Sequence, residues 1–163
     1  MTAATSAPAD LKIGALSGSP ITLSQWVTTF HLVVVVIDPY TDESAWVLDT
    51  AGRILSEFKG ADCRVGWLVT AGEDDARTFL GPWAKELLTL LDPDRTVVKA
   101  LGLEHLPALV HIRQDLSVAG VAEGWDPKQW QTVTDQLGTV MSWSKPRLPA
   151  AGDPSPFAGS AAL

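Results

Sequence analysis

The feature that most constrains the fold is an uninterrupted apolar run from Leu32 to Ile37, in which the last five side chains are β-branched. A strand with one face in solvent alternates apolar and polar residues, so an unbroken apolar run is typical of a strand buried on both faces. Pro39 has no N–H group to donate to a neighbouring strand and marks the end of this one. The sequence predicts a central strand in a sheet that carries helices on both sides.

Helical and extended patterns alternate after this strand. Residues 42–59 carry apolar or small side chains at the spacing of one buried helical face, and residues 64–70 form the next predicted strand. A second helix begins near Glu73 and is interrupted at Gly81-Pro82. The apolar residues 87–91 fit either the end of that helix or a short strand.

The last part of the chain predicts a hairpin flanked by two helices. A short helix over 96–101 precedes a strand from Leu106 to Ile112 and its antiparallel partner over 117–121. A further helix begins at Asp126-Pro127 and runs to about Leu137. Crossovers between parallel strands, followed by a hairpin and a terminal helix, imply an α/β fold with a mixed sheet and helices on both faces.

The chain is expected to divide into one domain and two loose ends. Residues 11–16 and 21–23 predict an N-terminal β-hairpin, which begins a domain over residues 11–143. Residues 1–10 are expected to be a flexible arm, and the Pro/Ala/Gly/Ser-rich residues 144–163 a disordered tail.

Composition and charge argue against several classes of function. With 46% hydrophobic and 19% charged residues, the chain of 163 residues suits one globular domain with a sizeable core. Its net charge of −7 argues against binding to nucleic acid or to an anionic membrane. We recognise no signal peptide and no apolar run long enough to span a bilayer. Cys63 is the only cysteine, so the chain forms no internal disulfide and a reducing, cytoplasmic location is expected.

The order of the predicted elements and several short segments resemble the thioredoxin fold, and within it the alkyl hydroperoxide reductase/TlpA-type redoxin family. The resemblance covers about residues 11 to 138. The segments that carry it are ITLSQW, LVVVVIDPYTDES, LLDPDRTVVKALGL, LPALVHI and GWDPKQW. It implies a three-layer α/β/α fold in which residues 87–91 form a strand. It also implies that LPALVHI is the proline loop of the family, with a cis bond between Leu106 and Pro107 that faces the active site.

The sequence departs from the family at the position that should carry the chemistry. Thioredoxins and TlpA-type proteins have Cys-x-x-Cys after the first long strand, where this chain has Thr41-Asp42-Glu43-Ser44. Peroxiredoxins have Thr-x-x-Cys there, which matches with serine in place of cysteine, although their proline and threonine lie further apart than Pro39 and Thr41. A helix N-terminus activates a thiol by lowering its pKa, whereas a serine hydroxyl is too weak an acid and forms no disulfide. Asp42 and Glu43 would further oppose an anionic nucleophile.

Cys63 is the one residue that could still carry thiol chemistry. It begins the second long strand, away from the helix start that activates thiols in this fold. The alternative interpretation is a small buried residue, which is how free cysteines usually behave.

Two other kinds of site could lie at the same helix start. Ser44 with one of the three histidines could suggest a hydrolase, but there is no Gly-x-Ser-x-Gly motif, and a helix start capped by Thr41 or Asp42 explains the residues equally well. The histidines are His31, His105 and His111. An oxygen-rich metal site could be built from Asp38, Asp42, Glu43 and His105. Its spacing matches no known metal-binding loop, so we expect neither a metal nor a cofactor.

The chain also has seven tryptophans, spread along its length. Most should lie in the core, while Trp46 and Trp143 are the better candidates for contact with a partner. We therefore expect a redoxin-like protein without its catalytic cysteines, which acts as a binding or accessory module for a protein partner. The alternatives are a thiol-dependent oxidoreductase or peroxidase that uses Cys63 or a partner's thiol, and a protein that binds a small ligand in the vacated pocket.

Overall fold

The computed structural model describes residues 4–16 and 19–163. The strands are β1 (Lys12–Ala15), β2 (Ile21–Thr22), β3 (His31–Ile37), β4 (Cys63–Val69), β5 (Leu88–Leu91), β6 (His105–Leu106), β7 (Ala108–Ile112), β8 (Val118–Glu123) and β9 (Ser160–Ala161). The helices are α1 (Leu23–Trp26), α2 (Asp42–Trp46), α3 (Leu48–Glu57), α4 (Glu73–Leu80), α5 (Trp83–Glu86), α6 (Thr96–Leu101) and α7 (Pro127–Met141).

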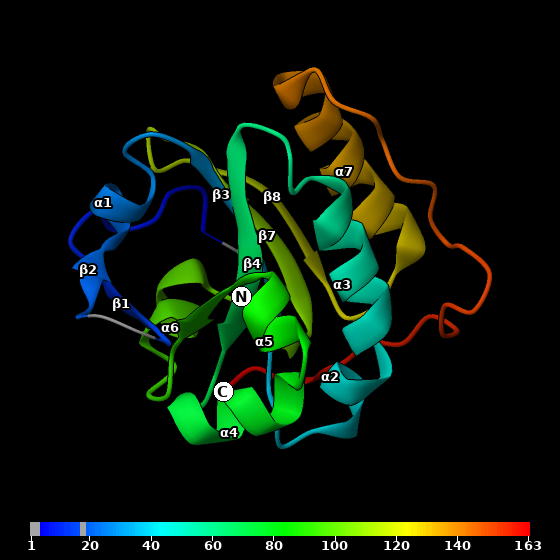
Figure 1. Ribbon diagram of the computed structural model, residues 1–163, viewed down its shortest axis with the longest axis horizontal. Coiled ribbons are helices and arrows are strands. Elements are labelled where there is room, and N and C mark those ends of the chain that lie inside the picture. Colours follow the sequence, from blue (N-terminus) through cyan, green and yellow to red (C-terminus); the bar gives the residue numbers. More distant parts are fainter. Residues whose placement is uncertain (1–3, 17–18) are drawn as a thin grey trace.

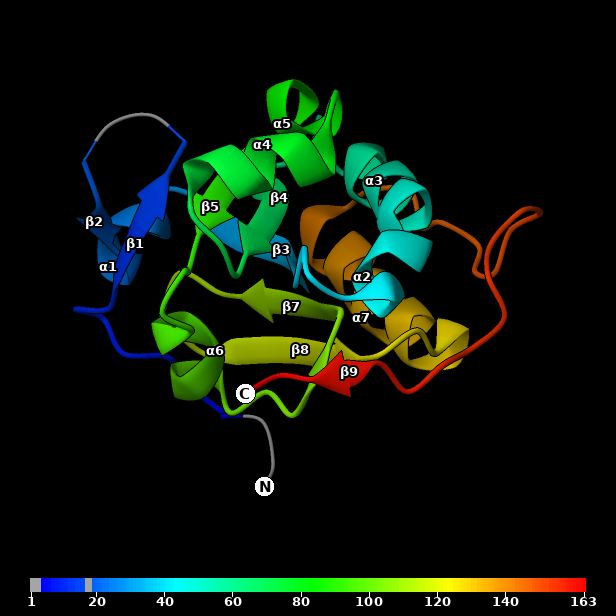
Figure 2. The same cartoon turned by 90° about the horizontal axis from the view of Figure 1, so that it is seen from below.

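A mixed sheet forms the centre of the molecule. Within the described residues it has seven strands in the order β2-β1-β5-β4-β3-β7-β8. β3 pairs parallel with β4 and antiparallel with β7, which makes it the central strand that its sequence predicts. Helices α3, α4, α5 and α7 cover one face, and α1 and α6 lie on the other (Figures 1 and 2). The N-terminal hairpin is also confirmed, since β1 pairs antiparallel with β2.

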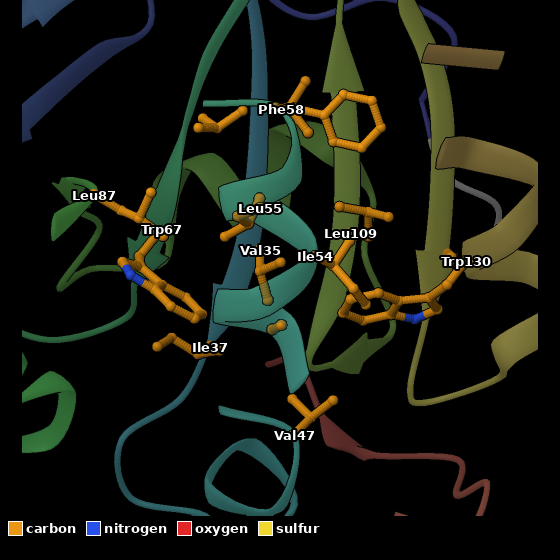
Figure 3. Packing of buried hydrophobic residues seen from close by; sticks show 14 of the residues in the cluster. Val35, Ile37, Val47, Ile54, Leu55, Phe58, Trp67, Leu87, Leu109 and Trp130 are labelled. Carbon is orange, nitrogen blue, oxygen red and sulfur yellow. The ribbon is translucent and has the colours of Figure 1, made fainter. Parts of the chain in front are cut away.

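The side chains of β3 alternate between two hydrophobic clusters. Val33, Val35 and Ile37 pack on the side of α3 and α7, and the intervening residues pack on the side of α1 and α6. Figure 3 shows Leu55 of α3 close to Val35 of β3, and Ile54 on the side of Leu109 and Trp130. Each fully buried aliphatic side chain contributes roughly 1.5–3 kcal/mol, so the apolar run holds both layers to the sheet.

The long helix expected over residues 42–59 is divided in two. Val47 separates α2 from α3 with φ −97° and ψ −2°, values at which the helical hydrogen-bond ladder is interrupted. Its side chain is fully buried in the cluster beneath α3. The apolar spacing predicts an inward face of Ala45, Leu48, Gly52, Leu55 and Phe58; the last three are buried, but Leu48 is half-buried and Ala45 is exposed. The spacing did not indicate the break at Val47.

The interruption at Gly81-Pro82 is confirmed and separates α4 from α5, with Gly81 in the left-handed region at φ 57°. Residues 88–91 form a strand that pairs parallel with β4, as the resemblance implied. Pro107 divides the expected strand 106–112 into β6 and β7.

Both expected loose ends lie against the domain where the structure describes them. Ala7 of the expected arm is buried and donates its N–H to the carbonyl of Leu116 at 2.9 Å, while residues 1–3 lie outside the described part. Residues 144–163, expected to be disordered, run along α7 and α3 and end in β9 (Figure 1). The composition suggests disorder, but Phe157 and the carboxylate of Asp153 supply specific anchors, since Asp153 accepts two hydrogen bonds from Arg53 at 2.6 and 3.0 Å. Within residues 4–16 and 19–163, no helix combines the length and the hydropathy needed to cross a bilayer.

Candidate functional site

The turn from β3 into α2 is held together by the two hydroxyl groups that replace the expected thiols. The side chain of Ser44 is fully buried, and its Oγ accepts a hydrogen bond from the backbone N–H of Asp38 at 2.9 Å. The hydroxyl of Thr41 donates to the carbonyl of Asp38 at 3.1 Å. Thr41 occupies the N-cap position of α2 but makes no capping bond with its side chain, so its role differs from the expected cap. Both hydroxyls therefore have structural partners inside the turn.

A buried ion pair lies next to this turn. Asp38 is 4% exposed, and its Oδ2 accepts a hydrogen bond from Arg95 at 2.7 Å, while its Oδ1 accepts from the N–H of Tyr40 at 3.0 Å. Arg95 precedes α6 in a left-handed conformation with φ 58°. The sequence marks Arg95 only as part of a turn after Asp92-Pro93, and nothing in its spacing indicates that it reaches Asp38.

The proline loop lies at the same end of the sheet. Val36 of β3 is paired with Ala108 of β7. Ile37, which follows Val36, and Pro107, which precedes Ala108, are therefore brought to the same end of the sheet. The Leu106–Pro107 peptide bond is cis. The two segments singled out from the sequence, Thr41 to Ser44 and Leu106-Pro107, therefore meet at the carboxyl end of β3.

The C-terminal segment covers this end of the sheet. β9 pairs antiparallel with β6, with His105 opposite Ala161 and Leu106 opposite Ser160. Figure 2 shows β9 in red beside the C-terminal end of β8. We call residues 157–162 the strap. Sequence reasoning missed it, because only tertiary contacts order this Pro/Ala/Gly/Ser-rich part of the chain.

Cys63 lies at the opposite end of the sheet. It is paired with His31 at the start of β3, whereas Ile37, which leads into the site, is paired with Val69. Six residues of strand separate the two ends, which amounts to about 20 Å. The Cys63 thiol is buried, with its Sγ 3.8 Å from the carbonyl of Phe58. Burial, and then the charge of Asp62, raise the pKa of Cys63 to about 11.

Two of the three histidines are paired with each other at the Cys63 end. Nδ1 of His31 lies 2.8 Å from Nε2 of His111, and the rings stack at 5.1 Å between centroids. His111 is fully buried, and its pKa is lowered to about 4 by burial and then by His31 and Arg113. His105 is exposed beside the strap. A serine–histidine pair is not assembled, because the Ser44 hydroxyl bonds to the turn backbone.

The side chains considered for an oxygen-rich metal site likewise have other partners or face solvent. Asp38 forms an ion pair with Arg95, and Asp42 is exposed to solvent at the start of α2. Over the part of the chain that the structure describes, no three His, Cys, Asp or Glu side chains are grouped as metal ligands would be.

Two exposed aromatic side chains flank the turn. Tyr40 is 66% exposed and donates its hydroxyl hydrogen bond to Asp75. Trp46 is 56% exposed and packs edge-on against Phe157 of the strap, with 5.4 Å between ring centroids. Trp143, the other tryptophan considered for contact with a partner, lies away from the turn. Its indole N–H donates to the carbonyl of Glu57, the last residue of α3.

Comparison with known proteins bears on the fold. No protein-family model and no curated protein sequence matches the chain. Several solved structures match it over most of its length. The thioredoxin domain of a thiol-disulfide oxidoreductase from Bacteroides vulgatus is 14% identical with a TM-score of 0.64, covering 83% of this chain and 98% of that one. The bacterioferritin comigratory protein of Xanthomonas campestris is 14% identical with a TM-score of 0.63, covering 89% and 99%. A secreted disulfide oxidoreductase of Mycobacterium tuberculosis is 14% identical with a TM-score of 0.58, covering 82% and 95%.

This chain has a thioredoxin-like fold. At such low identities the likeness shows the fold alone, and the site must be judged by its own residues. In this thioredoxin-like chain the hydroxyls of Thr41 and Ser44 stand where the sequence resemblance places the thiols. The single thiol, on Cys63, lies at the other end of the sheet.

Proposed function

We propose that this protein is a non-catalytic binding module with a thioredoxin-like fold. The proposed binding surface combines Tyr40, Trp46 and the turn Thr41 to Ser44 with the loop at Leu106-Pro107, and the proposed partner is a protein. The observation that carries the proposal is the state of Ser44. It is fully buried and its hydroxyl is engaged by the backbone of Asp38, at the position where a redox-active relative would need a reactive thiol.

The chemistry of the turn supports a role other than catalysis. A serine hydroxyl ionises far above physiological pH and cannot form a disulfide, so the turn has no group that could exchange with a substrate thiol. Asp42 and Glu43 lie in the first turn of α2, where their charges oppose formation of another anion. Burial raises the pKa of Cys63, so very little of it is the nucleophilic thiolate at physiological pH.

The exposed aromatic pair supports protein binding. Tyrosine and tryptophan contribute large contact areas at protein interfaces, and both side chains here remain more than half exposed beside the turn. The net charge of −7 favours a partner with a basic or neutral surface over nucleic acid.

The first experiment tests the absence of catalysis. Hydroperoxide consumption and disulfide reduction are measured with a dithiol reductant for the wild type and for Cys63→Ser. We expect both proteins to show the background rate. Turnover by the wild type that Cys63→Ser abolishes would instead support the alternative, a thiol-dependent oxidoreductase or peroxidase that acts through Cys63.

The second experiment tests the surface. Proteins captured by the immobilised wild type are compared with those captured by Trp46→Ala and by Val140→Ala, which removes an exposed apolar side chain from α7. We expect the same partner to be captured by the wild type and by Val140→Ala, and to be lost with Trp46→Ala. Equal capture by all three proteins would place the binding surface elsewhere.

A further inference from the structure

The strap makes a continuous set of backbone hydrogen bonds with the edge of the proposed binding surface. Phe157 exchanges two backbone bonds with Trp125, at 3.0 and 2.8 Å. β9 then pairs with β6, and the N–H of Ala162 donates to the carbonyl of Glu104 at 2.9 Å. The strap thus adds an antiparallel strand to the segment that leads into Pro107, in the manner by which extended peptides bind to a sheet edge.

Arg95 connects the strap to the turn at the end of β3. One of its guanidinium nitrogens donates to Asp38, and the other donates to the carbonyl of Ala162 at 2.5 Å. The side chain of Ala162 is 1% exposed in the cluster that includes Leu106. The same arginine therefore fastens the last part of the strap to the core of the site.

The strap fits this edge through two glycines. Gly159 has φ 93°, and a Cβ atom placed there would lie 2.6 Å from the carbonyl oxygen of Leu106. Gly124 lies on the opposite side of the contact, where a Cβ atom would lie 2.4 Å from the carbonyl oxygen of Ala158. Backbone approaches backbone too closely at both positions for any larger residue. The edge is thus shaped for an extended segment with glycine at one defined position.

The chain before the strap is fastened separately. Asp153 accepts hydrogen bonds from Arg53 and from the hydroxyl of Thr50, the latter at 2.9 Å. Residues 157–162 can therefore leave the edge while the preceding segment stays attached to α3. A release confined to the strap would uncover the backbone groups of β6 and of Trp125 that are bonded to it.

We propose that the strap covers the β6 edge of the protein-binding surface in cis, so that a partner reaches this edge only when the strap is displaced. The partner's binding segment is extended and has a glycine in the place of Gly159, because only such a segment fits between Leu106 and Gly124. This proposal rests on the proposed binding function for its biological meaning. Displacement of the strap can still be tested without the partner, by a peptide with the sequence of the strap.

The experiment uses the full-length protein and a fluorescent synthetic peptide with the sequence of residues 154–163, whose binding is followed by fluorescence anisotropy. Gly159→Val is the releasing variant, because its side chain meets the Leu106 carbonyl. Ala158→Val is the matched control, because it enlarges the neighbouring, exposed side chain of the same strap. Amide hydrogen exchange at residues 157–162 reports strap release directly in all three proteins.

We expect Gly159→Val to lose amide protection over the strap and to bind the peptide. The wild type and Ala158→Val should keep their protection and bind it more weakly by about tenfold or more, since a tethered segment competes at an effective concentration in the millimolar range. The same peptide carrying Gly159→Val should not bind any of the proteins. Retained protection in Gly159→Val, or a released strap with no peptide binding, would overturn the proposal.

These outcomes are separate from those that test the proposed function. If Gly159→Val binds the peptide but captures no more of the partner than the wild type does, the strap is confirmed and the partner site lies elsewhere. If neither the peptide nor the partner binds to Gly159→Val, both proposals fail.

Discussion

The two ends of the central sheet hold different halves of what a thiol site needs. At the carboxyl end of β3, a short helix begins beside a loop with a cis-proline, but its buried side chain is the hydroxyl of Ser44. At the other end, Cys63 supplies a sulfur atom, but it starts a strand and its pKa is raised. A thiol becomes reactive through its surroundings, above all a helix N-terminus or a nearby positive charge, so the presence of a cysteine alone indicates little.

The two ends also differ in how their polar groups are satisfied. The site end has an ion pair, Asp38 with Arg95, and the far end has the neutral pair of His31 and His111. Charged pairs and neutral pairs respond differently to mutation and to pH, which makes the comparison testable.

Arg95→Ala should have the largest effect on stability. It leaves the carboxylate of Asp38, whose side chain is 6% exposed, without its cation and also removes a strap contact. Breaking a buried pair in this way costs about 3–5 kcal/mol, and we expect the lower part of that range because Arg95 is partly exposed. Urea denaturation measures the change. Arg77→Ala, which breaks an exposed pair with Glu73 on α4, should cost only about 0.3–0.5 kcal/mol, and a similar loss in both variants would refute the contrast.

The histidine pair should make the far end sensitive to acid. The pKa of His111 in the folded protein is about 4, whereas an ordinary histidine has a pKa of 6.5, so as the pH falls the unfolded chain takes up the proton before the folded protein does. The stabilisation is therefore fully present above about pH 6.5 and is lost as the pH falls toward 4, by about 3 kcal/mol in total. The free energy of unfolding, measured by urea denaturation at several pH values in this range, should change less with pH for His111→Phe than for the wild type.

The thiol of Cys63 should alkylate slowly. Raising its pKa from 9.0 to about 11 lowers the thiolate fraction at pH 8 by about a hundredfold relative to an ordinary cysteine. The rate of modification by iodoacetamide, compared with that of glutathione, measures this. Denaturation in urea provides the internal control, because unfolding should restore the ordinary rate. Rapid alkylation of the folded protein would show that Cys63 is accessible and activated after all.

Ser44→Ala should have the smallest effect of the four. The substitution leaves the N–H of Asp38 buried without its acceptor, at a cost of about 1–3 kcal/mol. The matched control is Ser56→Ala on the exposed side of α3, which should change the free energy of unfolding by less than about 0.5 kcal/mol. If Ser44→Ala proves neutral, the hydroxyl is not needed by the turn and another reason for the serine must be sought.

Much of the fold follows from local patterns in the sequence. The apolar run of β3 predicts a doubly covered central strand, and the glycine and proline positions predict the ends of several helices. The break at Val47 was not predictable, since its apolar side chain fits a continuous helix as well as two short ones. The order of residues 144–163 was not predictable either, because composition counts weak local preferences and ignores distant anchors such as the contact of Asp153 with Arg53.

The candidate site divides in the same way. The sequence by itself determined that Thr41 to Ser44 contain no thiol and that the one cysteine begins a different strand, since these are facts of residue identity and local pattern. Only the tertiary structure decided that Arg95 joins Asp38 to the strap and that the strap pairs with β6. Those contacts join residues far apart in the chain, and short-range sequence patterns do not indicate which distant groups will form hydrogen bonds.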